Sequence, residues 1–259
     1  MSVKNVDFCI THFLRVERLQ ELLQSIKFYY PEANITVACQ GAIPEIPEIE
    51  GCTAILTPFD SGLSYNRNIL VKNTERPFFL LLEDDFVFTE KTLLEPFLNV
   101  LGQDKDIGVV GGLVLENGYP VRFEHLLELD EKERVLYHRP DGNKWQFTGD
   151  TRFKYTDSCI NFALFRRELF QDCLWDPGQK LAEHNDFYLR LKDTKWKVAS
   201  TEDTELYTNK HDGTEYKAFK RRPEFRMRLL RKHNLKKIVY QNGYTMTMKN
   251  DKLLTGKNL

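Results

Sequence analysis

The sequence predicts an α/β fold, a single domain with a mostly parallel central sheet flanked by helices and an irregular C-terminal portion. Residues 6–41 read as strand, helix and strand, the order typical of a right-handed β-α-β unit. The run "PFFLLLEDD" at 77–85 is apolar without interruption before its acidic end, which suits a central strand buried on both faces. The 259 residues contain no repeat and no linker-like change of composition, so we expect one domain.

The first β-α-β unit can be read residue by residue. Residues 6–13 form a short apolar strand, and residues 16–29 place Val16, Leu19, Leu22, Leu23 and Ile26 on one helical face. Pro31 ends this helix, and residues 34–41 alternate as a second strand that stops at Gly41.

Four further elements follow before residue 119. We expect strands at 52–58 and 107–118, a helix at 62–74, and a second helix at 89–103 with Thr89 as its N-cap. Pro96 inside that last helix argues against its full length, because proline removes a backbone donor. Residues 119–147 alternate weakly, as expected for hairpins or loops.

Composition excludes several classes of protein. Lys and Arg number 37 against 38 Asp and Glu, so no global field favours a polyanionic partner. The five cysteines show no C-x-x-C spacing, which fits neither a disulfide framework nor a thiolate zinc site. No apolar stretch reaches the ~20 residues of a membrane span, and the first thirty residues carry charges, so we expect a cytoplasmic protein.

Three consecutive carboxylates follow the buried strand in "FFLLLEDDFVFT". Glu83, Asp84 and Asp85 repel one another, so a cation or several hydrogen-bond donors must neutralise them. Oxygen ligands of this kind suit Mg²⁺ or Mn²⁺, and ligands bind at the carboxyl ends of parallel strands. An acidic helix start or a solvated turn is the alternative.

Three other segments carry candidate site residues. In "DSGLSYNRN", Arg67 at the start of a helix could bind an anion, although a capped helix with a surface Arg explains it equally. In "AEHNDFYLR", Glu183 and Asp186 near a helix start could serve as a general base, or could simply cap the helix. His211 in "YTNKHDG" could complete a metal site, or could be a solvated loop residue.

The order of these motifs resembles the nucleotide-sugar glycosyltransferases of the GT-A fold, including the family 2 enzymes. Among them the segments from Asp60 to Ser200 look closest to the β-1,4-N-acetylgalactosaminyltransferases of the GM2-synthase type. The resemblance implies a nucleotide-binding half at 1–115, an acceptor and catalytic half at 116–215, and a basic C-terminal segment at 216–259.

The resemblance also implies roles for individual residues. "EDD" stands where the family has its Asp-x-Asp motif, so Asp85 and His211 would bind Mn²⁺ or Mg²⁺ on the diphosphate of a UDP-sugar. The other nucleotide-binding candidates are Thr11, Arg15, Asp60, Arg67, Glu83 and Asp84. The acceptor-side acidic motif of the family maps to "EHNDF", so Asp186 would be the base, with Glu183 second. Related transferases often have Glu and Asp adjacent, whereas His184 intervenes here.

The implied reaction is the inverting transfer of GalNAc, GlcNAc, Gal or Glc from a UDP-sugar to a hydroxyl of a glycan or a lipid-linked acceptor. A sugar nucleotidyltransferase is an alternative, but "THFLRVERL" lacks the glycine-rich phosphate loop that such an enzyme needs. Residues 217–237 hold ten Lys or Arg against one Glu, which suits peripheral contact with an anionic membrane. The same segment allows a non-catalytic binding module for anionic surfaces or nucleic acid, although we expect no nucleic-acid partner.

Overall fold

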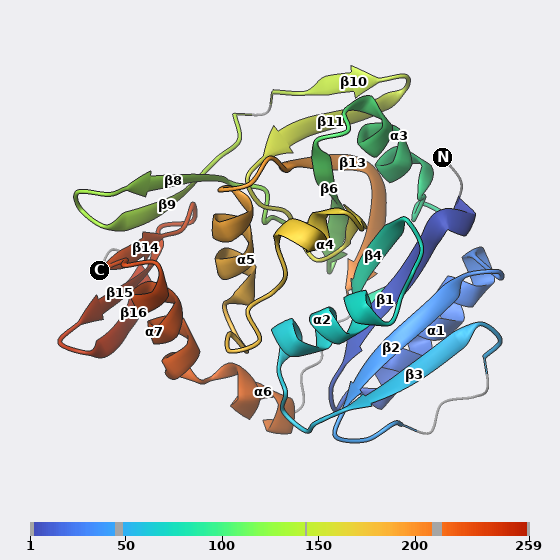
Figure 1. Cartoon of the computed structure of the whole chain (residues 1–259), viewed down its shortest axis with the longest axis horizontal. Helices are drawn as coiled ribbons and strands as arrows, with labels where there is room; N and C mark the ends of the chain where they lie inside the picture. Colours follow the sequence, from blue (N-terminus) through green and yellow to red (C-terminus); the bar gives the residue numbers. More distant parts are fainter. Residues whose placement is uncertain (1–2, 45–48, 143, 209–213, 258–259) are drawn as a thin grey trace.

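The computed structural model describes residues 3–44, 49–142, 144–208 and 214–257. Its centre is a mixed sheet, eleven-stranded in the described residues, whose parallel half has the order β4, β1, β2, β3 (Figure 1). These strands are β1 (Val6–His12), β2 (Asn34–Gln40), β3 (Cys52–Thr57) and β4 (Phe78–Glu83).

The other half of this sheet begins with β12 (Ala163–Arg166), which runs antiparallel to both β4 and β6. The sheet is therefore mixed, and less parallel than the sequence predicts. Its remaining strands are β6 (Ile107–Glu116), β13 (Lys197–Thr208), β11 (Thr151–Thr156) and β10 (Gln146–Thr148), with β5 (Phe86–Val87) on β13 and β7 (Tyr119–Val121) on β6.

A second sheet of five strands stands at the opposite end of the molecule from β3 (Figure 1). It joins the hairpin β8 (Leu126–Asp130) and β9 (Val135–Arg139) to the last strands of the chain. Those strands are β14 (Lys237–Val239), β15 (Tyr244–Lys249) and β16 (Lys252–Lys257). The C-terminal portion is thus more regular than the sequence predicts.

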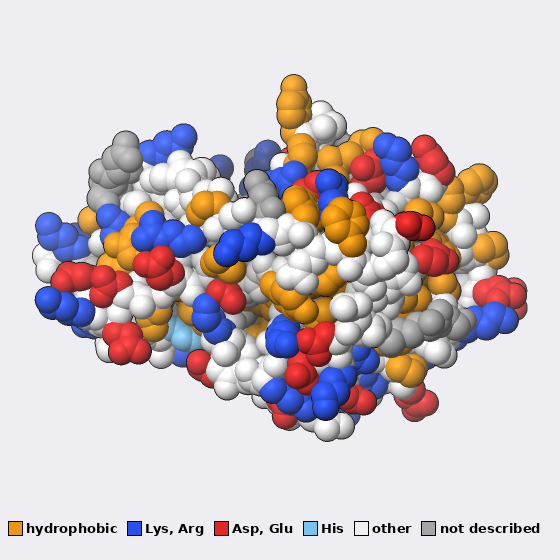
Figure 2. Space-filling view, turned by 90° about the horizontal axis from the view of Figure 1, so that it is seen from above, with side chains coloured by type: hydrophobic (Ala, Val, Ile, Leu, Met, Phe, Trp, Pro, Cys, Tyr) orange, Lys and Arg blue, Asp and Glu red, His pale blue; other side chains and the backbone are white. Residues whose placement is uncertain are grey.

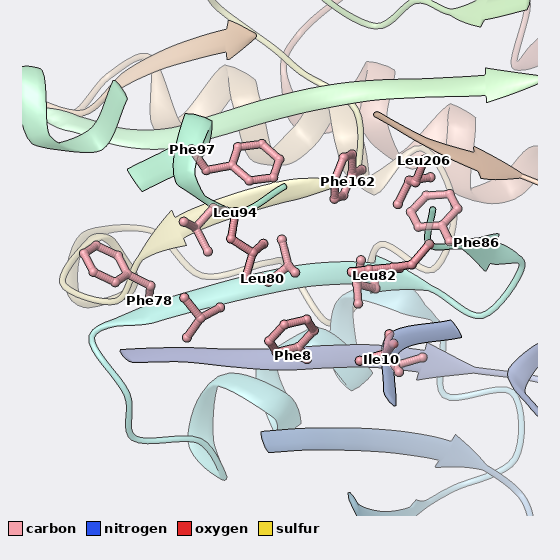
Figure 3. Close-up of a cluster of buried hydrophobic side chains, with 14 of the residues drawn as sticks. Phe8, Ile10, Phe78, Leu80, Leu82, Phe86, Leu94, Phe97, Phe162 and Leu206 are labelled. Atoms are coloured by element: carbon pink, nitrogen blue, oxygen red, sulfur yellow. The ribbon is translucent and has the colours of Figure 1, made fainter. Parts of the chain in front are cut away.

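Helices cover both faces of the large sheet. The apolar cluster on one face contains side chains of α1 (Val16–Tyr29) and α3 (Glu95–Gln103). Figure 3 shows part of this cluster, with Phe97 of α3 near Phe162 and with Phe8 near Leu80. The cluster on the other face contains side chains of α2 (Leu63–Lys72), α4 (Leu169–Asp172), α5 (Glu183–Leu191) and α7 (Pro223–Lys232). The short helices η1 (Val3–Asn5) and α6 (Thr214–Lys220) complete the described elements.

Helix α1 has the bounds that its apolar spacing predicts, whereas α3 is shorter than predicted. It begins at Glu95, so Pro96 lies in its first turn, where the missing N–H has no intrahelical partner to lose. Thr89 lies in a turn before the helix, where its backbone N–H donates to Thr92 Oγ1 at 2.9 Å.

The surface shows no dominant charge. Lys and Arg side chains are interspersed with Asp and Glu over the face seen in Figure 2, as the near-zero net charge predicts. In the described part of the chain, every helix is too short or too polar to cross a membrane.

Candidate active site

The carboxyl end of β4 brings the acidic residues to the end of β1. Thr11 in β1 lies in register with Glu83, and Asp84 and Asp85 form the turn that leads from β4 into β5. Thr11 is 4% exposed and packs inside the sheet edge. The central parallel strands therefore present their carboxyl ends together, as expected for a ligand site in such a sheet.

Asp84 is held by the end of β1. Its Oδ2 accepts hydrogen bonds from His12 Nδ1 at 2.8 Å and from the Phe13 backbone N–H at 3.2 Å, and its Oδ1 accepts one from Arg15. Asp84 is almost wholly buried, so these donors replace the water that it loses. Its contacts fix the turn after β4.

Asp85 is only half neutralised. Arg15 Nη1 donates to its Oδ2 at 2.7 Å, while the buried Oδ1 has no hydrogen-bond partner among the described protein atoms. Burial, reinforced by the charge of Glu83, raises the pKa of Asp85 to about 6, although Arg15 opposes the shift. A second cation beside Oδ1 would relieve both the missing hydrogen bond and the repulsion.

Arg67 lies beside the carboxylates of Glu83 and Glu183. Its side chain is fully buried in α2, with Nη1 at 3.0 Å from Glu183 Oε1 and Nη2 at 3.8 Å from Glu83 Oε1. Asn161 Nδ2 also donates to Glu83 Oε1, at 2.6 Å. Arg67 Nε and Nη2 have no hydrogen-bond partner within the described residues. These contacts favour a role in positioning the two carboxylates over the direct ligand role that the resemblance implies.

A pocket of about 420 Å³ opens beside Glu83 and Glu183. Burial raises the pKa of Glu183, and the neighbouring Arg67 opposes that shift. Other residues that line the pocket include His125, His138, Asn161, His184, Arg226 and Tyr240. A larger hollow of about 890 Å³, lined by Leu126, Leu189 and Leu235 among others, contains none of the predicted site residues.

Asp186 is absent from the lining of this pocket. Its Oδ1 lies 2.8 Å from His233 Nε2 and 2.7 Å from Lys232 Nζ, and its Oδ2 lies 3.0 Å from Arg190 Nε. Burial by itself would raise the pKa of Asp186, but the hydrogen bonds from His233 and Lys232 outweigh it and hold the pKa well below its usual range. These contacts tie Asp186 to α7, outside the pocket that Glu183 lines, and the choice of base between the two carboxylates stays a prediction.

The predicted nucleotide residues Arg15 and Asp60 contact the segment that follows β13. Arg222 donates to both carboxylate oxygens of Asp60, at 2.7 and 2.8 Å, and Lys180 Nζ lies 3.0 Å from Asp60 Oδ2. The guanidinium of Arg15 lies 4.3 Å from the centre of the Tyr216 ring. Four aromatic rings meet beside these contacts, those of Phe13, Phe59, Tyr216 and Phe219.

Only part of the predicted metal site can be examined. His211 lies outside the described residues. Within the described ranges, no group of three His, Cys, Asp or Glu side chains has the geometry of a complete metal site. The orphaned Oδ1 of Asp85 and the excess of carboxylates over Arg15 nevertheless suit a divalent cation at this point.

Sequence reasoning missed His12, Asn161 and Tyr216. His12 and Asn161 reach the acidic residues from other parts of the chain, since 72 residues separate His12 from Asp84 and 78 separate Asn161 from Glu83. Tyr216 instead packs against Arg15. His12 lies near the carboxyl end of a predicted strand, at the binding edge of the sheet, and that position was the available signal.

Comparison with known proteins gives a consistent result. The sequence profile of glycosyl transferase family 2 matches residues 9–174. β-1,4 N-acetylgalactosaminyltransferase 1 of Mus musculus and of Homo sapiens is 30% identical over 181 residues, which cover 68% of this chain and 34% of each relative. This chain therefore matches about a third of the length of those relatives.

Solved structures share the fold. S. aureus TarS 1-349 in complex with UDP-GlcNAc has a TM-score of 0.60 at 14% identity, over 88% of this chain and 66% of that one. GalNAc-T7 with UDP, GalNAc and Mn²⁺ has a TM-score of 0.56 at 12% identity, over 78% and 43% of the two chains. The GT-A fold expected from the resemblance is confirmed.

Proposed function

Because this chain belongs to glycosyl transferase family 2, we propose that it transfers a sugar from a UDP-sugar to a hydroxyl group of a glycan or glycolipid. The proposed reaction inverts the configuration at the anomeric carbon and uses a divalent cation. GalNAc and GlcNAc are the first donor sugars to test, followed by Gal and Glc. Support for the first two comes from the names of the N-acetylgalactosaminyltransferase relatives and from the TarS complex with UDP-GlcNAc.

The observation that carries this proposal is the position of Glu183. Its carboxylate lines the same pocket as Glu83, the last residue of the strand that leads into Asp84 and Asp85. Glu83, which leads into the acidic turn, and the candidate base Glu183 thus line one pocket. Such an arrangement suits an acceptor hydroxyl that must meet a donor sugar.

Glu183 is suited to take the proton of that hydroxyl. Burial raises its pKa, which makes the carboxylate a stronger base than an exposed glutamate, while Arg67 at 3.0 Å orients it and favours its ionised form. The hydroxyl would attack the anomeric carbon as Glu183 removes its proton. A single displacement of this kind inverts the configuration at that carbon.

The donor side would be held by the residues around Asp85. Asp85 and Glu83 would hold a divalent cation, and a bound cation would stabilise the negative charge of the departing diphosphate. Arg15 would then have to share Asp85 with that cation, or turn to the diphosphate itself. His211, the second predicted metal ligand, and the uracil contacts of Thr11 and Asp60 stay predictions.

The test is transfer from a panel of UDP-GalNAc, UDP-GlcNAc, UDP-Gal and UDP-Glc to mixed glycan acceptors, with release of UDP as the readout. We expect turnover with at least one donor, and a loss of about 10²- to 10⁴-fold in kcat for Glu183→Gln with UDP affinity unchanged. The control Glu128→Gln alters an exposed pair with Arg139 and should keep full activity. Full activity of Glu183→Gln would remove Glu183 as the base.

Several basic side chains of segment 217–237 form ion pairs with acidic residues of this chain. Arg222 pairs with Asp60, Arg228 and Lys232 pair with Asp176, and Arg231 pairs with Asp251. Peripheral contact of this segment with an anionic membrane and a cytoplasmic location both stay predictions. The internal pairs leave fewer cations for the alternative of a non-catalytic binding module.

A further inference from the structure

Asp84 differs from its neighbour Asp85 in how the protein holds it. Both side chains are almost wholly buried, and Asp85 Oδ1 has no hydrogen-bond partner among the described protein atoms. Both oxygens of Asp84, in contrast, accept hydrogen bonds from the end of β1: Oδ1 from Arg15, and Oδ2 from His12 and from the backbone N–H of Phe13. These contacts suit a structural role for Asp84 within the acidic turn.

His12 ties the carboxylate of Asp84 to the central sheet. It is the last residue of β1 and is 3% exposed. Its backbone lies in register with Cys39 of β2, and the preceding residue Thr11 lies in register with Glu83 of β4. Because β1 pairs with a strand on each side, the imidazole extends from a fixed backbone position. Its Nδ1 lies 2.8 Å from Asp84 Oδ2, and since a carboxylate oxygen accepts, Nδ1 carries the hydrogen.

Arg15 connects Asp84 to Asp85. One terminal nitrogen, Nη2, donates to Asp84 Oδ1, and the other, Nη1, donates to Asp85 Oδ2 at 2.7 Å. The guanidinium is planar and rigid, so the carboxylate that holds one of these nitrogens also sets the position of the other. The guanidinium carbon lies 4.3 Å from the centre of the Tyr216 ring, which restricts its tilt. A path of contacts therefore runs from His12 through Asp84 and Arg15 to Asp85.

Loss of the imidazole donor would act on Asp85 through this path. Asp84 Oδ2 would keep the backbone N–H of Phe13 as its donor within the described residues. A buried carboxylate that has lost a donor is stabilised by another one, and Arg15 is a charged donor already in contact with it. Arg15 would then bind both oxygens of Asp84, as the bidentate geometry of a guanidinium favours, and would release Asp85 Oδ2.

We propose that His12 is a positioning residue for the cation site: its Nδ1–H fixes Asp84, and Asp84 through Arg15 sets the carboxylate of Asp85 where a divalent cation can bind it. The inference rests on the proposed function, in which Asp85 holds the cation. It adds to that site a residue that lies 72 positions before Asp84 in the chain. Hydrogen bonds behind a metal ligand orient the ligand and tune the affinity of the site.

The test is Mn²⁺ binding to the full chain, measured from the electron paramagnetic resonance signal of the free ion. His12→Leu removes the donor and keeps an apolar side chain in its place, and we expect it to weaken Mn²⁺ binding by about 10- to 100-fold. The number of ions bound at saturating Mn²⁺ should equal that of the wild type, because Asp85 is still present. His12→Asn places an amide N–H near the position of Nδ1 and should keep most of the affinity.

The matched control is Cys39→Ala, at the position that lies in register with His12 on the neighbouring strand. Cys39 is fully buried, and its thiol donates to the Val37 carbonyl. This variant should lower the free energy of unfolding, as truncation of a buried side chain does, and should leave Mn²⁺ affinity unchanged. Urea unfolding of every variant measures the loss of stability separately. His12→Ala removes the same donor and replaces His12→Leu if that variant does not fold.

Weaker Mn²⁺ binding in the variants without the donor, with near-normal binding in His12→Asn and Cys39→Ala, would support the inference. Unchanged Mn²⁺ affinity in folded His12→Leu or His12→Ala would overturn it, as would an equal loss in Cys39→Ala or an equal loss in His12→Asn. A wild-type protein that binds no Mn²⁺ would contradict the cation of the proposed function, and this inference with it.

Discussion

Replacing Arg67 by methionine removes a cation that lies 3.0 Å from Glu183 and 3.8 Å from Glu83. Arg67 is fully buried, and the side chain of its partner Glu183 is 8% exposed. Breaking a buried ion pair from one side costs about 3–5 kcal/mol, because the remaining charge stays out of water. For a domain of this size, such a loss lowers Tm by roughly 6–20 °C.

The cost should depend on pH in a defined direction. Burial already raises the pKa of Glu183 above that of an exposed glutamate, and removal of Arg67 raises it further. A carboxyl with a raised pKa binds more protons in the folded state than in the unfolded state, so stability falls as pH rises above about 4.5. Arg67→Met should therefore be more destabilising at pH 8 than at pH 5.

Urea unfolding of the wild type and the variant at the two pH values measures this difference. The control Arg228→Met breaks an exposed pair with Asp176 and should cost at most about 1 kcal/mol. Adding Glu183→Gln to Arg67→Met should recover part of the lost stability, since the orphaned charge is then gone. A cost below about 1 kcal/mol for Arg67→Met, or a cost independent of pH, would refute the reasoning.

Three further predictions concern single residues. Asp186→Asn should lower Tm, because it weakens the contacts that hold α7, but it should lower kcat far less than Glu183→Gln does; thermal melts and initial rates on both variants decide this. Mn²⁺ affinity measured by calorimetry should strengthen as pH rises through about 6, because the cation requires the ionised form of Asp85, and a flat profile between pH 5 and 7 would contradict that assignment. Gly111→Ala should destabilise the protein by about 1–3 kcal/mol in urea unfolding, because the new methyl group would lie 2.5 Å from Cys159 Cβ; an unchanged midpoint would mean that β6 can shift.

Local sequence patterns predicted the helices and strands whose bounds depend on residues adjacent in the chain. The bounds of α1 follow from its apolar spacing, and the acidic end of β4 follows from an apolar run that stops at Glu83. In both cases the spacing of apolar residues within one segment predicts which of its side chains are buried.

Contacts between distant segments could not be predicted in this way. Glu183 and Asp186 are three residues apart and share one side of α5, so helical periodicity cannot separate their roles. The two carboxylates differ in their partners from other parts of the chain. Lys232 and His233 pair with Asp186, whereas Arg67 pairs with Glu183.

The second sheet was missed for the same reason. Its parallel pairing joins Ile238 of β14 to Leu136 of β9, about a hundred residues earlier in the chain. Each strand is short, and neither has a pattern that indicates its partner. The position of His138 beside Tyr240 depends on that pairing, so no local pattern predicts it.

Calorimetric titration of UDP tests most directly the central claim, a sugar-nucleotide site at the carboxyl end of β4. The titration is made with Mn²⁺, with EDTA, and with the variant Asp85→Asn, which keeps the size of the side chain and removes its charge. We predict binding that is strong with Mn²⁺ and weakened both by EDTA and by Asp85→Asn. Absence of UDP binding under every condition, in a protein that folds normally, would contradict the account.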